Sequence, residues 1–402
     1  MSKSIYISTS GNDNNSGLSS EIPIKTINKI NSLSLLAGDK VLFKCGDIWQ
    51  GVNSSLILAS GNSNGYVAYS YYGSGNRPIL TTTSIKNNLT DWIDDSGNIW
   101  STSSSVDVGL IISSNNNIIG KKVWNLTDIT EQGKYWYDID NKKLRIYSVG
   151  NPATYYNKDI QLVLRNHGIT GWSKNYIAID GLHISKVGEH GISFQDVGNI
   201  VVQNCLFDYI GGADEYLDKT SKMRFGNGLE FWNSAHDTVV QNCVFNQIYD
   251  GAFTTQGNLK SVMQHQSFNN NVCNNCERPT EFWCTPDSVF SDIKVENNQL
   301  LNSGYGWGHE RLDTGNARAL AITSMSSTAF GFSFQHNIIT NSKDSIYRIS
   351  DYNWISSMVL DYNIYSNSDG MFMHINNGDD YTMDKFYLWK SNFAKDVHSI
   401  VI

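Results

Sequence analysis

Proline and charged side chains are both scarce in this chain. Its 402 residues include 5 prolines, and only 17% of the residues are charged. The 38 acidic side chains outnumber the 30 lysines and arginines, so the net charge is 30 − 38 = −8. Nucleic-acid binding relies on clustered lysines and arginines, and the sequence has no such cluster, so we expect no nucleic-acid partner. The 12% of aromatic residues exclude a disordered polymer.

Long apolar runs are also missing. No stretch approaches the ~18 consecutive apolar residues of a membrane-spanning helix, so we expect no membrane partner. The first residues, MSKSIYISTSG, lack the apolar core of a signal peptide. We therefore expect a soluble protein that, if exported, leaves the cell by another route.

Six cysteines in so long a chain do not make the framework of a disulfide-rich protein. Cys273, Cys276 and Cys284 could supply three zinc ligands, but no second cysteine pair accompanies them. The alternative is that these thiols are small apolar side chains of the core. We expect no resident metal or cofactor from this pattern.

An internal repeat is the most informative feature of the sequence. The segment VVQNCLF at Val201–Phe207 recurs as VVQNCVF at Val239–Phe245, an offset of 243 − 205 = 38 residues. Weaker copies place an asparagine in the cysteine column, at steps of 28, 27, 39, 26 and 29 residues: Asn271, Asn298, Asn337, Asn363 and Asn392. Short alternating strands that recur every ~20–30 residues are typical of a parallel solenoid, and an antiparallel sandwich is the alternative.

A second strand precedes these copies, at Gly191–Phe194, Gly228–Phe231, Gly251–Thr254 and Pro279–Phe282. Side chains alternate between the two faces of a strand, so the residues between two inward side chains point outward. We expect one outward column of Ser193, Glu230, Phe253 and Glu281. A second column just before the strands then holds His190, Asn227, Asp250 and Arg278.

The repeat and the N-terminal segment resemble the pectate lyase-like superfamily of right-handed parallel β-helices. That segment runs from IYISTSGNDNNSG at Ile5–Gly17 through Pro23–Ile27 to Gly38–Phe43. The superfamily includes polygalacturonases, polysaccharide lyases, epimerases and phage tailspike depolymerases. Polygalacturonase motifs are matched only faintly, by Gly188–Gly191, and the calcium-binding carboxylates of pectate lyases are not matched. The resemblance implies an all-β fold and a polysaccharide substrate.

The resemblance also raises three expectations about the protein's surroundings. Many relatives bind calcium, so a Ca²⁺ ion is left open although no ligand set stands out. Phage tail proteins with this fold are often trimers, so a homotrimer is expected on that analogy. The same analogy implies an extracellular or virion-associated location.

The presence or absence of the repeat along the sequence predicts three regions. Residues 1–80 would form an N-terminal cap, with a helix near Ile24–Leu36, and the first coils at Val41–Phe43, Leu56–Leu58 and Tyr66–Tyr69. Residues 81–160 break the repeat and predict a small β-rich insertion, with a hairpin over Tyr135–Tyr147. Residues 161–402 would form the main β-helix and carry the active groove.

Three carboxylates are the first candidates for catalysis. Glu230 and Glu281 are separated by one intervening coil, hence by ~9–10 Å at ~4.7–4.9 Å per coil. That separation is near the ~6.5–9.5 Å between the two carboxyl groups of an inverting glycosidase. Asp250, on the coil between them, could act as the base. We therefore expect a polysaccharide depolymerase that works by hydrolysis.

Aromatic and polar neighbours of these carboxylates are candidates for substrate binding. Indole faces are suited to the apolar faces of sugar rings. The candidates are Trp232, Trp283, Trp307, His190, Asn227, Arg278 and Glu310. Packing of the tryptophans under loops, and a structural salt-bridged ladder of the glutamates with Arg278, are the alternatives.

Two other functions stay open on the sequence. A lyase would use His309 or His190 to abstract a proton next to a uronate carboxylate that Arg311 neutralises, with Asp313 in the same loop. A glycan-binding or phage receptor-binding protein would use the same tryptophans without catalysis.

Overall fold

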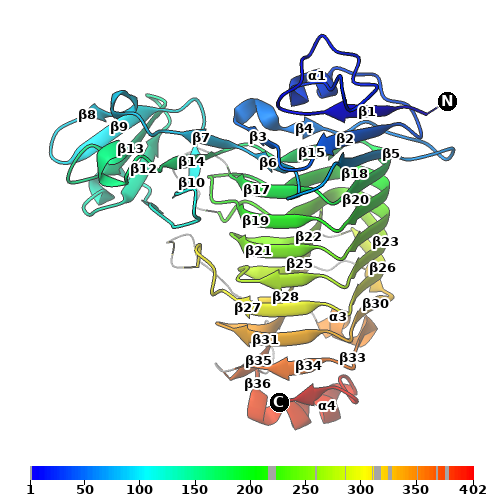
Figure 1. The fold of residues 1–402 in the computed structure, drawn as a ribbon. Coiled ribbons are helices and arrows are strands. Elements are labelled where there is room, and N and C mark those ends of the chain that lie inside the picture. Colours follow the sequence, from blue (N-terminus) through cyan, green and yellow to red (C-terminus); the bar gives the residue numbers. More distant parts are fainter. Residues whose placement is uncertain are drawn as a thin grey trace.

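The main body of the protein is a parallel β-helix, whose coils stack from the N-terminal to the C-terminal end (Figure 1). The computed structural model describes residues 2–215, 223–258, 260–285, 287–309, 311, 318–324, 328–350, 352–367, 370–375 and 380–402. This architecture confirms the predicted all-β solenoid and excludes the antiparallel sandwich. In the described part of the chain, no helix is long and apolar enough to cross a membrane.

Two parallel sheets form the coils. The strands of the first sheet are β1 (Ser4–Ile7), β2 (Lys40–Lys44), β4 (Leu56–Ile57), β5 (Val67–Tyr72), β15 (Ile169–Trp172), β16 (Asn175–Asp180), β18 (Ile192–Gln203), β20 (Leu229–Gln241), β22 (Gly251–Gly257), β23 (Val262–Asn269), β25 (Arg278–Cys284), β26 (Val289–Glu296), β28 (Arg318–Ser324), β29 (Thr328–Phe330), β30 (Phe332–Gln335), β32 (Ser345–Ile349), β33 (Met358–Asp361), β35 (Met371–Ile375) and the antiparallel β36 (Tyr381–Thr382). Those of the second sheet are β3 (Ile48–Gln50), β6 (Ile79–Thr81), β17 (His183–Val187), β19 (Leu206–Ile210), β21 (Val244–Ile248), β24 (Val272–Asn274), β27 (Gln299–Ser303), β31 (Ile338–Ser342), β34 (Ile364–Ser366) and β37 (Ile400–Val401).

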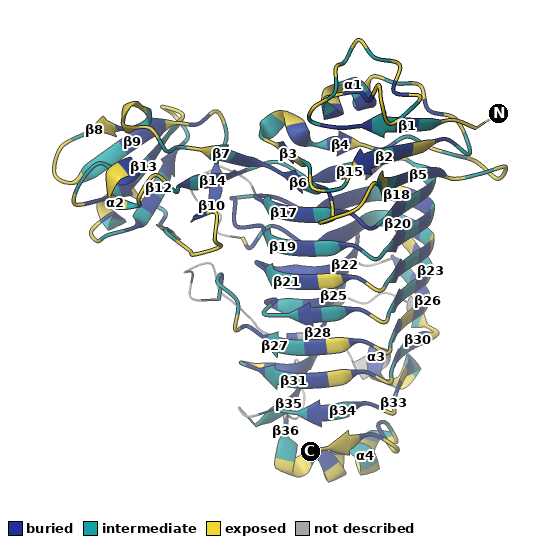
Figure 2. Cartoon of the chain, viewed as in Figure 1, coloured by how far each residue is buried: buried dark blue, intermediate teal, exposed yellow. Residues whose placement is uncertain are grey.

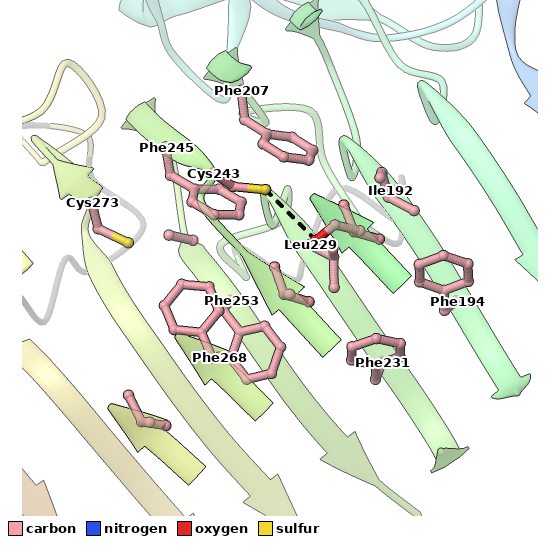
Figure 3. Close-up of a cluster of buried hydrophobic side chains, with 14 of the residues drawn as sticks. Ile192, Phe194, Phe207, Leu229, Phe231, Cys243, Phe245, Phe253, Phe268 and Cys273 are labelled. Atoms are coloured by element: carbon pink, nitrogen blue, oxygen red, sulfur yellow. Dashed lines mark hydrogen bonds between the residues drawn. The ribbon is translucent and has the colours of Figure 1, made fainter. Parts of the chain in front are cut away.

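Buried residues recur along the strands of successive coils (Figure 2), and their inward side chains form the core (Figure 3). The rings of Phe194 and Phe231 stack with centroids 5.2 Å apart, and those of Phe207 and Phe245 with centroids 4.5 Å apart. Each fully buried side chain of this kind contributes ~1.5–3 kcal/mol of hydrophobic free energy. Ile192 and Leu229 are also fully buried, so the predicted inward positions of β18 and β20 are confirmed.

The register of β22 differs from the sequence prediction by one residue. Leu229 pairs with Phe253, and Glu230 pairs with Thr254. Phe253 therefore points into the core, where it is 1% exposed, and Thr254 takes the outward position that the sequence assigned to Phe253. The same shift pairs Gly251, and not Asp250, with Arg278. The sequence prediction was wrong here because the alternation of Gly251–Thr254 fits either register.

An asparagine ladder at one corner of the coils holds successive turns together. The backbone N–H of Cys243 donates to Oδ1 of Asn271, and the backbone N–H of each ladder asparagine donates to the next member at 2.8–2.9 Å. The ladder side chains are Asn271, Asn298, Asn337, Asn363 and finally Ser399. Each asparagine Nδ2 also donates to a backbone carbonyl of a neighbouring coil. The predicted column is confirmed up to Asn363.

A short helix lies at each end of the solenoid (Figure 1). At the N-terminal end α1 (Ile27–Asn31) is shorter than the helix expected at Ile24–Leu36, and Thr26 caps it by accepting from the N–H of Lys29. At the other end α4 (Phe386–Phe393) packs Trp389 onto the last coils. Asn392 lies in α4, so its assignment to the turn column was wrong.

Residues 83–164 contain an antiparallel insertion beside the N-terminal coils (Figure 1). One small sheet joins β7 (Thr83–Ile85), β14 (Gln161–Leu164) and β10 (Val108–Ile112). Another joins β8 (Ile93–Asp94), β9 (Ile99–Ser103), β13 (Lys143–Tyr147), β12 (Lys134–Asp138) and β11 (Lys121–Lys122). The antiparallel pairing of β12 and β13 confirms the predicted hairpin. The remaining described helices are α2 (Pro152–Tyr155) and α3 (Tyr352–Ser357).

Removal of one ladder side chain is expected to destabilise the whole solenoid. Asn298→Ala removes the donor to the carbonyl of Phe268 and leaves the buried N–H of Asn271 without its acceptor. At ~1–3 kcal/mol for each buried group left unpaired, the free energy of unfolding should fall by at least ~2 kcal/mol. Urea denaturation measures this change. The control is Asn14→Ala at an exposed position, and equal stability of the two variants would contradict the role of the ladder.

Candidate active site

A cavity of about 600 Å³ lies on the outer face of β15, β18, β20, β22 and β25. Its lining includes eight of the candidate residues from the sequence: His190, Asn227, Glu230, Trp232, Asp250, Arg278, Glu281 and Trp283. The lining also contains Ser193 of the predicted outward column, and residues that the sequence did not single out: His167, Trp172, Gln195, Glu215, Met223, Arg224, Phe225 and Gln256. Predicted residues from several coils thus meet in one concave site.

Strand register places the cavity's outward side chains in two rows. One row runs through Ser193, Glu230, Thr254 and Glu281 on four successive coils. The other runs through Trp172, Gln195, Trp232, Gln256 and Trp283 on five coils. Glu230 and Glu281 are separated by the coil of Thr254, as the sequence predicted.

Glu230 is held by two neighbours from the loops before the strands. Nδ2 of Asn227 donates to Oε1 of Glu230 at 3.1 Å, while Oδ1 of Asn227 accepts from the N–H of Gly251. Nε2 of His190 lies 3.0 Å from Oε2 of Glu230. Both carboxyl oxygens therefore face uncharged polar groups, and the backbone of the next coil orients Asn227.

The protonation state of His190 follows from its contacts. Its Nδ1 accepts the backbone N–H of Asn227 at 2.9 Å, so the neutral ring carries its proton on Nε2, the atom facing Glu230. Burial and the neighbouring His167 hold the pKa of His190 well below its ordinary value. The two histidine rings are parallel, with centroids 5.3 Å apart. His190 therefore positions Glu230 as a neutral group.

Glu230 has the perturbed pKa expected of a general acid. Burial raises the pKa of Glu230 to about 8, the hydrogen bond from Asn227 opposes this rise, and the charges of Asp250, Glu215 and Glu281 add to it. Water stabilises a carboxylate much better than this buried site does, so the proton is retained at neutral pH.

Arg278 joins the other two carboxylates. Its Nη1 donates to Oε1 of Glu281 at 2.6 Å and lies 3.2 Å from Oδ1 of Asp250, an ion pair without hydrogen-bond geometry. Burial raises the pKa of Asp250 to about 6, although the Arg278 charge opposes the rise. The salt bridge that the sequence left as an alternative is therefore present between Glu281 and Arg278, inside the cavity, whereas Glu230 contacts His190 and Asn227 instead.

Two of the three cavity tryptophans stack on each other across the coil of Gln256. Trp232 and Trp283 belong to coils two apart, yet their rings stack with centroids 5.8 Å apart and an interplanar angle of 7°. A sugar ring between them would need ~7 Å, two carbon contacts of ~3.5 Å. Only their outer faces and edges can therefore contact a ligand.

His309, which the sequence analysis placed beside Glu281, is not among the described residues that line the cavity. Its Nδ1 is 3.1 Å from Oε2 of Glu277, a 2% exposed carboxylate that is also 3.8 Å from Nη2 of Arg224. Burial alone would raise the pKa of Glu277, but His309 and Arg224 hold it below its ordinary value. Arg224 stacks on the ring of Tyr249 and donates to the carbonyls of Tyr249 and Gly308.

Arg311 and Trp307 join the insertion to the coils and do not line the cavity. Nη1 of Arg311 donates to the carbonyl of Gly212 at 2.9 Å and of Gly109 at 3.3 Å. Nε1 of Trp307 donates to the carbonyl of Gln247, and its ring packs against the core of β10 and β14. The predicted uronate clamp at Arg311 and the Trp307 platform are therefore misplaced. Glu310 and Asp313 lie outside the described residues.

The missed lining residues had little sequence signal. His167 precedes the repeated strands, and Glu215 and Arg224 lie in the long loop between β19 and β20. Burial, followed by the charge of Arg165, lowers the pKa of His167 to about 4. Only Trp172, a lone indole near the start of the regular coils, could have been added by its residue type.

The described residues contain no group of three His, Cys, Asp or Glu side chains that could hold a metal ion. Cys273, Cys276 and Cys284 are buried in the core, which places them as apolar thiols. Burial raises the pKa of Cys276 to about 12, so its thiol stays protonated and is a poor metal ligand. A calcium ion stays a prediction.

Comparison with known proteins identifies similar folds. No protein-family model matches the sequence, and no curated protein matches it either. A solved structure described as a glycoside hydrolase is similar to this chain, at 10% sequence identity and a TM-score of 0.56. The match covers 94% of this chain and 90% of the chain in that structure. That likeness agrees with the β-helix fold expected from the sequence.

Two further solved structures have lower scores. The match with the family 28 exopolygalacturonase of Yersinia enterocolitica covers 93% of this chain and 66% of the exopolygalacturonase chain, at 12% sequence identity and a TM-score of 0.45. The match with pectate lyase Pel9A covers 94% of this chain and 79% of the pectate lyase chain, at 12% sequence identity and a TM-score of 0.43.

The raised pKa of Glu230 can be measured without a substrate. Carbon-13 NMR of labelled glutamate side chains should show one carboxyl group with a pKa of about 8 that is absent from Glu230→Gln. Asn227→Ala should raise this pKa further, because it removes a hydrogen bond that favours the ionised form. A Glu230 resonance that titrates below pH 5 would contradict this assignment.

Proposed function

We propose that the protein is a glycoside hydrolase that cleaves glycosidic bonds of a polysaccharide in the cavity between Trp172 and Glu281. The observation that carries the proposal is a pair of carboxyl groups with opposite protonation states. Glu230 has a pKa of about 8 and Asp250 one of about 6, so between these pH values one is protonated and the other ionised. Such a pair supplies the acid and the base of glycoside hydrolysis.

Glu230 is proposed as the general acid. It would donate its proton to the glycosidic oxygen as the bond to the anomeric carbon breaks. His190 and Asn227 hold both of its oxygens, so the proton is presented in a fixed direction. The charge on Glu230 after proton transfer would be stabilised by the Nε2–H of His190 and by Nδ2 of Asn227.

Asp250 is proposed as the general base. Glu281 accepts a short, charge-assisted hydrogen bond from Arg278, which weakens it as a proton acceptor. Asp250 has only an ion pair to the same nitrogen and a raised pKa, so it takes a proton from water more readily. That water would attack the anomeric carbon directly as Asp250 takes its proton, and we propose this single displacement, which inverts the anomeric configuration.

Geometry favours hydrolysis over elimination. The lyase hypothesis needs a base and a cation beside the substrate. His309 is bonded to Glu277, and Arg311 is bonded to backbone carbonyls outside the cavity. His190, the other candidate base, lies in the cavity, but its Nδ1 accepts a backbone N–H and its Nε2 carries the proton that faces Glu230, so neither nitrogen is available to take a proton from a substrate. The similar structure described as a glycoside hydrolase is compatible with the proposal. An extracellular or virion-associated location and a homotrimer stay predictions.

Substitution of the acid and the base tests the proposal. Incubation with neutral and acidic polysaccharides should release new reducing ends without the ultraviolet absorbance of unsaturated uronates. Glu230→Gln and Asp250→Asn should each lower kcat/KM by ~10²–10⁴, the usual contribution of a general acid or base. The control is Glu21→Gln at an exposed position. Ultraviolet absorbance together with new reducing ends would establish a lyase. Glycan binding without either of these two signals would establish a binding protein.

The pH dependence of kcat/KM provides a second test. Activity needs ionised Asp250, so it should fall as the pH drops through about 6. It also needs protonated Glu230, so it should fall as the pH rises through about 8. A bell-shaped profile with its optimum near pH 7 is therefore expected. A profile still rising above pH 9 would exclude Glu230 as the acid.

A further inference from the structure

We infer that the cavity accepts glycans that carry no carboxylate, sulfate or phosphate group, and that the row of alternating tryptophan and glutamine side chains recognises them. The inference rests on the proposed function, because it names the substrate class of the same site. It is carried by the charges of the lining and by their partners.

Acidic groups outnumber basic ones among the described residues of the lining. Four carboxyl groups face two guanidinium groups, and the described lining contains no lysine. The carboxyl groups belong to Glu215, Glu230, Asp250 and Glu281, and the guanidinium groups to Arg224 and Arg278. Even with Glu230 protonated, three negative charges face two positive ones. A low-dielectric cleft of this sign repels an anionic ligand.

Both arginines are already occupied by protein groups. Arg278 bridges Glu281 at 2.6 Å and Asp250 at 3.2 Å. Arg224 donates to the carbonyl of Gly308 at 3.1 Å and lies 3.8 Å from Glu277. An anionic sugar could pair with either only by displacing a buried partner, which would leave that carboxylate or carbonyl unpaired at a high cost.

The histidines do not supply the missing positive charge. Nδ1 of His190 accepts a backbone N–H, which requires a ring that is unprotonated at that nitrogen. His167 is largely buried against His190 and Trp172, with ring centroids 5.3 and 5.9 Å away. Neither histidine therefore offers a cation to a uronate or a sulfate at neutral pH.

The second outward row is uncharged along its whole length. Trp172, Gln195, Trp232, Gln256 and Trp283 pair in register on five successive coils, a span of roughly 19 Å at ~4.8 Å per coil. Trp172 is 51% exposed, and its Nε1 donates to Oγ of Ser193. Indole faces suit the C–H faces of sugars, and glutamine amides both donate to and accept from hydroxyl groups.

The two rows of outward side chains therefore have different roles in the cavity. The Glu230 row carries charge and performs the chemistry, and the adjoining Trp–Gln row contacts the sugar without charge. A neutral glycan without uronic acid units also lacks the acidified proton that β-elimination removes, whereas a methyl-esterified uronate keeps this proton.

Chemically matched pairs of glycans test this inference. The pairs are polygalacturonate with its fully methyl-esterified form and hyaluronan with its carboxyl-reduced form, each alongside oligosaccharides of xylan, galactan and chitin. Binding is measured by calorimetry on Glu230→Gln, which keeps the charge that the protonated acid has at pH 7, and cleavage is measured on the unaltered protein. We expect binding of at least one uncharged glycan, at least about ten-fold weaker binding of each acidic pair member, and little change in the binding of the uncharged glycan between about 0.05 and about 0.5 M salt.

A charge variant provides the matched control. Glu281→Gln removes a negative charge from the cavity and frees one contact of Arg278, so it should strengthen binding of the acidic probes about three-fold or more, equivalent to ~0.6 kcal/mol. Glu21→Gln removes an equal charge at an exposed position outside the cavity and should change nothing.

The outcomes separate the inference from the proposed function. Cleavage or binding of an acidic glycan as strong as that of its uncharged partner would overturn the substrate class and leave the hydrolase standing. Binding of uncharged glycans without any new reducing ends would overturn the hydrolase and leave the substrate class standing. Neither binding nor cleavage of any glycan of the panel, acidic or uncharged, would overturn both.

Discussion

Hydrogen bonds between stacked asparagine side chains are the constraint on which the rest of the structure depends. Each ladder asparagine side chain binds a backbone N–H and a backbone carbonyl of the preceding coil, so neighbouring coils cannot slip by a residue without breaking both bonds. A slip of one residue would turn every outward side chain inward. The columns of the site, from Glu230 to Glu281, therefore inherit their alignment from this corner of the solenoid.

That alignment brings together groups that repel one another or lose hydration. Glu230 and Asp250 both have raised pKa values because the coils bury them beside other carboxyl groups. The protein tolerates this arrangement through neutral partners for Glu230 and through Arg278 for Asp250 and Glu281. Buried carboxyl groups whose pKa values differ from one another are a feature of functional sites, because stability alone would favour apolar residues at these positions.

The predicted site was most accurate where the repeat was regular. Glu230, Glu281, Trp232 and Trp283 follow the same pattern of strand residues, so their common face could be derived from alternation alone. The β22 register was missed because Gly251 was aligned with the leading glycines Gly191 and Gly228, whereas Ala252 takes that place and Phe253 points inward. Arg311 and His309 were misplaced because they lie in a loop, where the repeat gives no information about direction.

The sequence by itself determined the solenoid, the asparagine column and the strand face that carries the carboxyl groups, because these follow from short-range periodicity. Tertiary structure decided which of those groups share one cavity, what holds each of them and how readily each binds a proton. It also brought His167, Glu215 and Arg224 to the same wall from segments outside the repeat. The reason is physical: side-chain alternation is local to a strand, whereas burial and electrostatic coupling depend on neighbours far away in the chain.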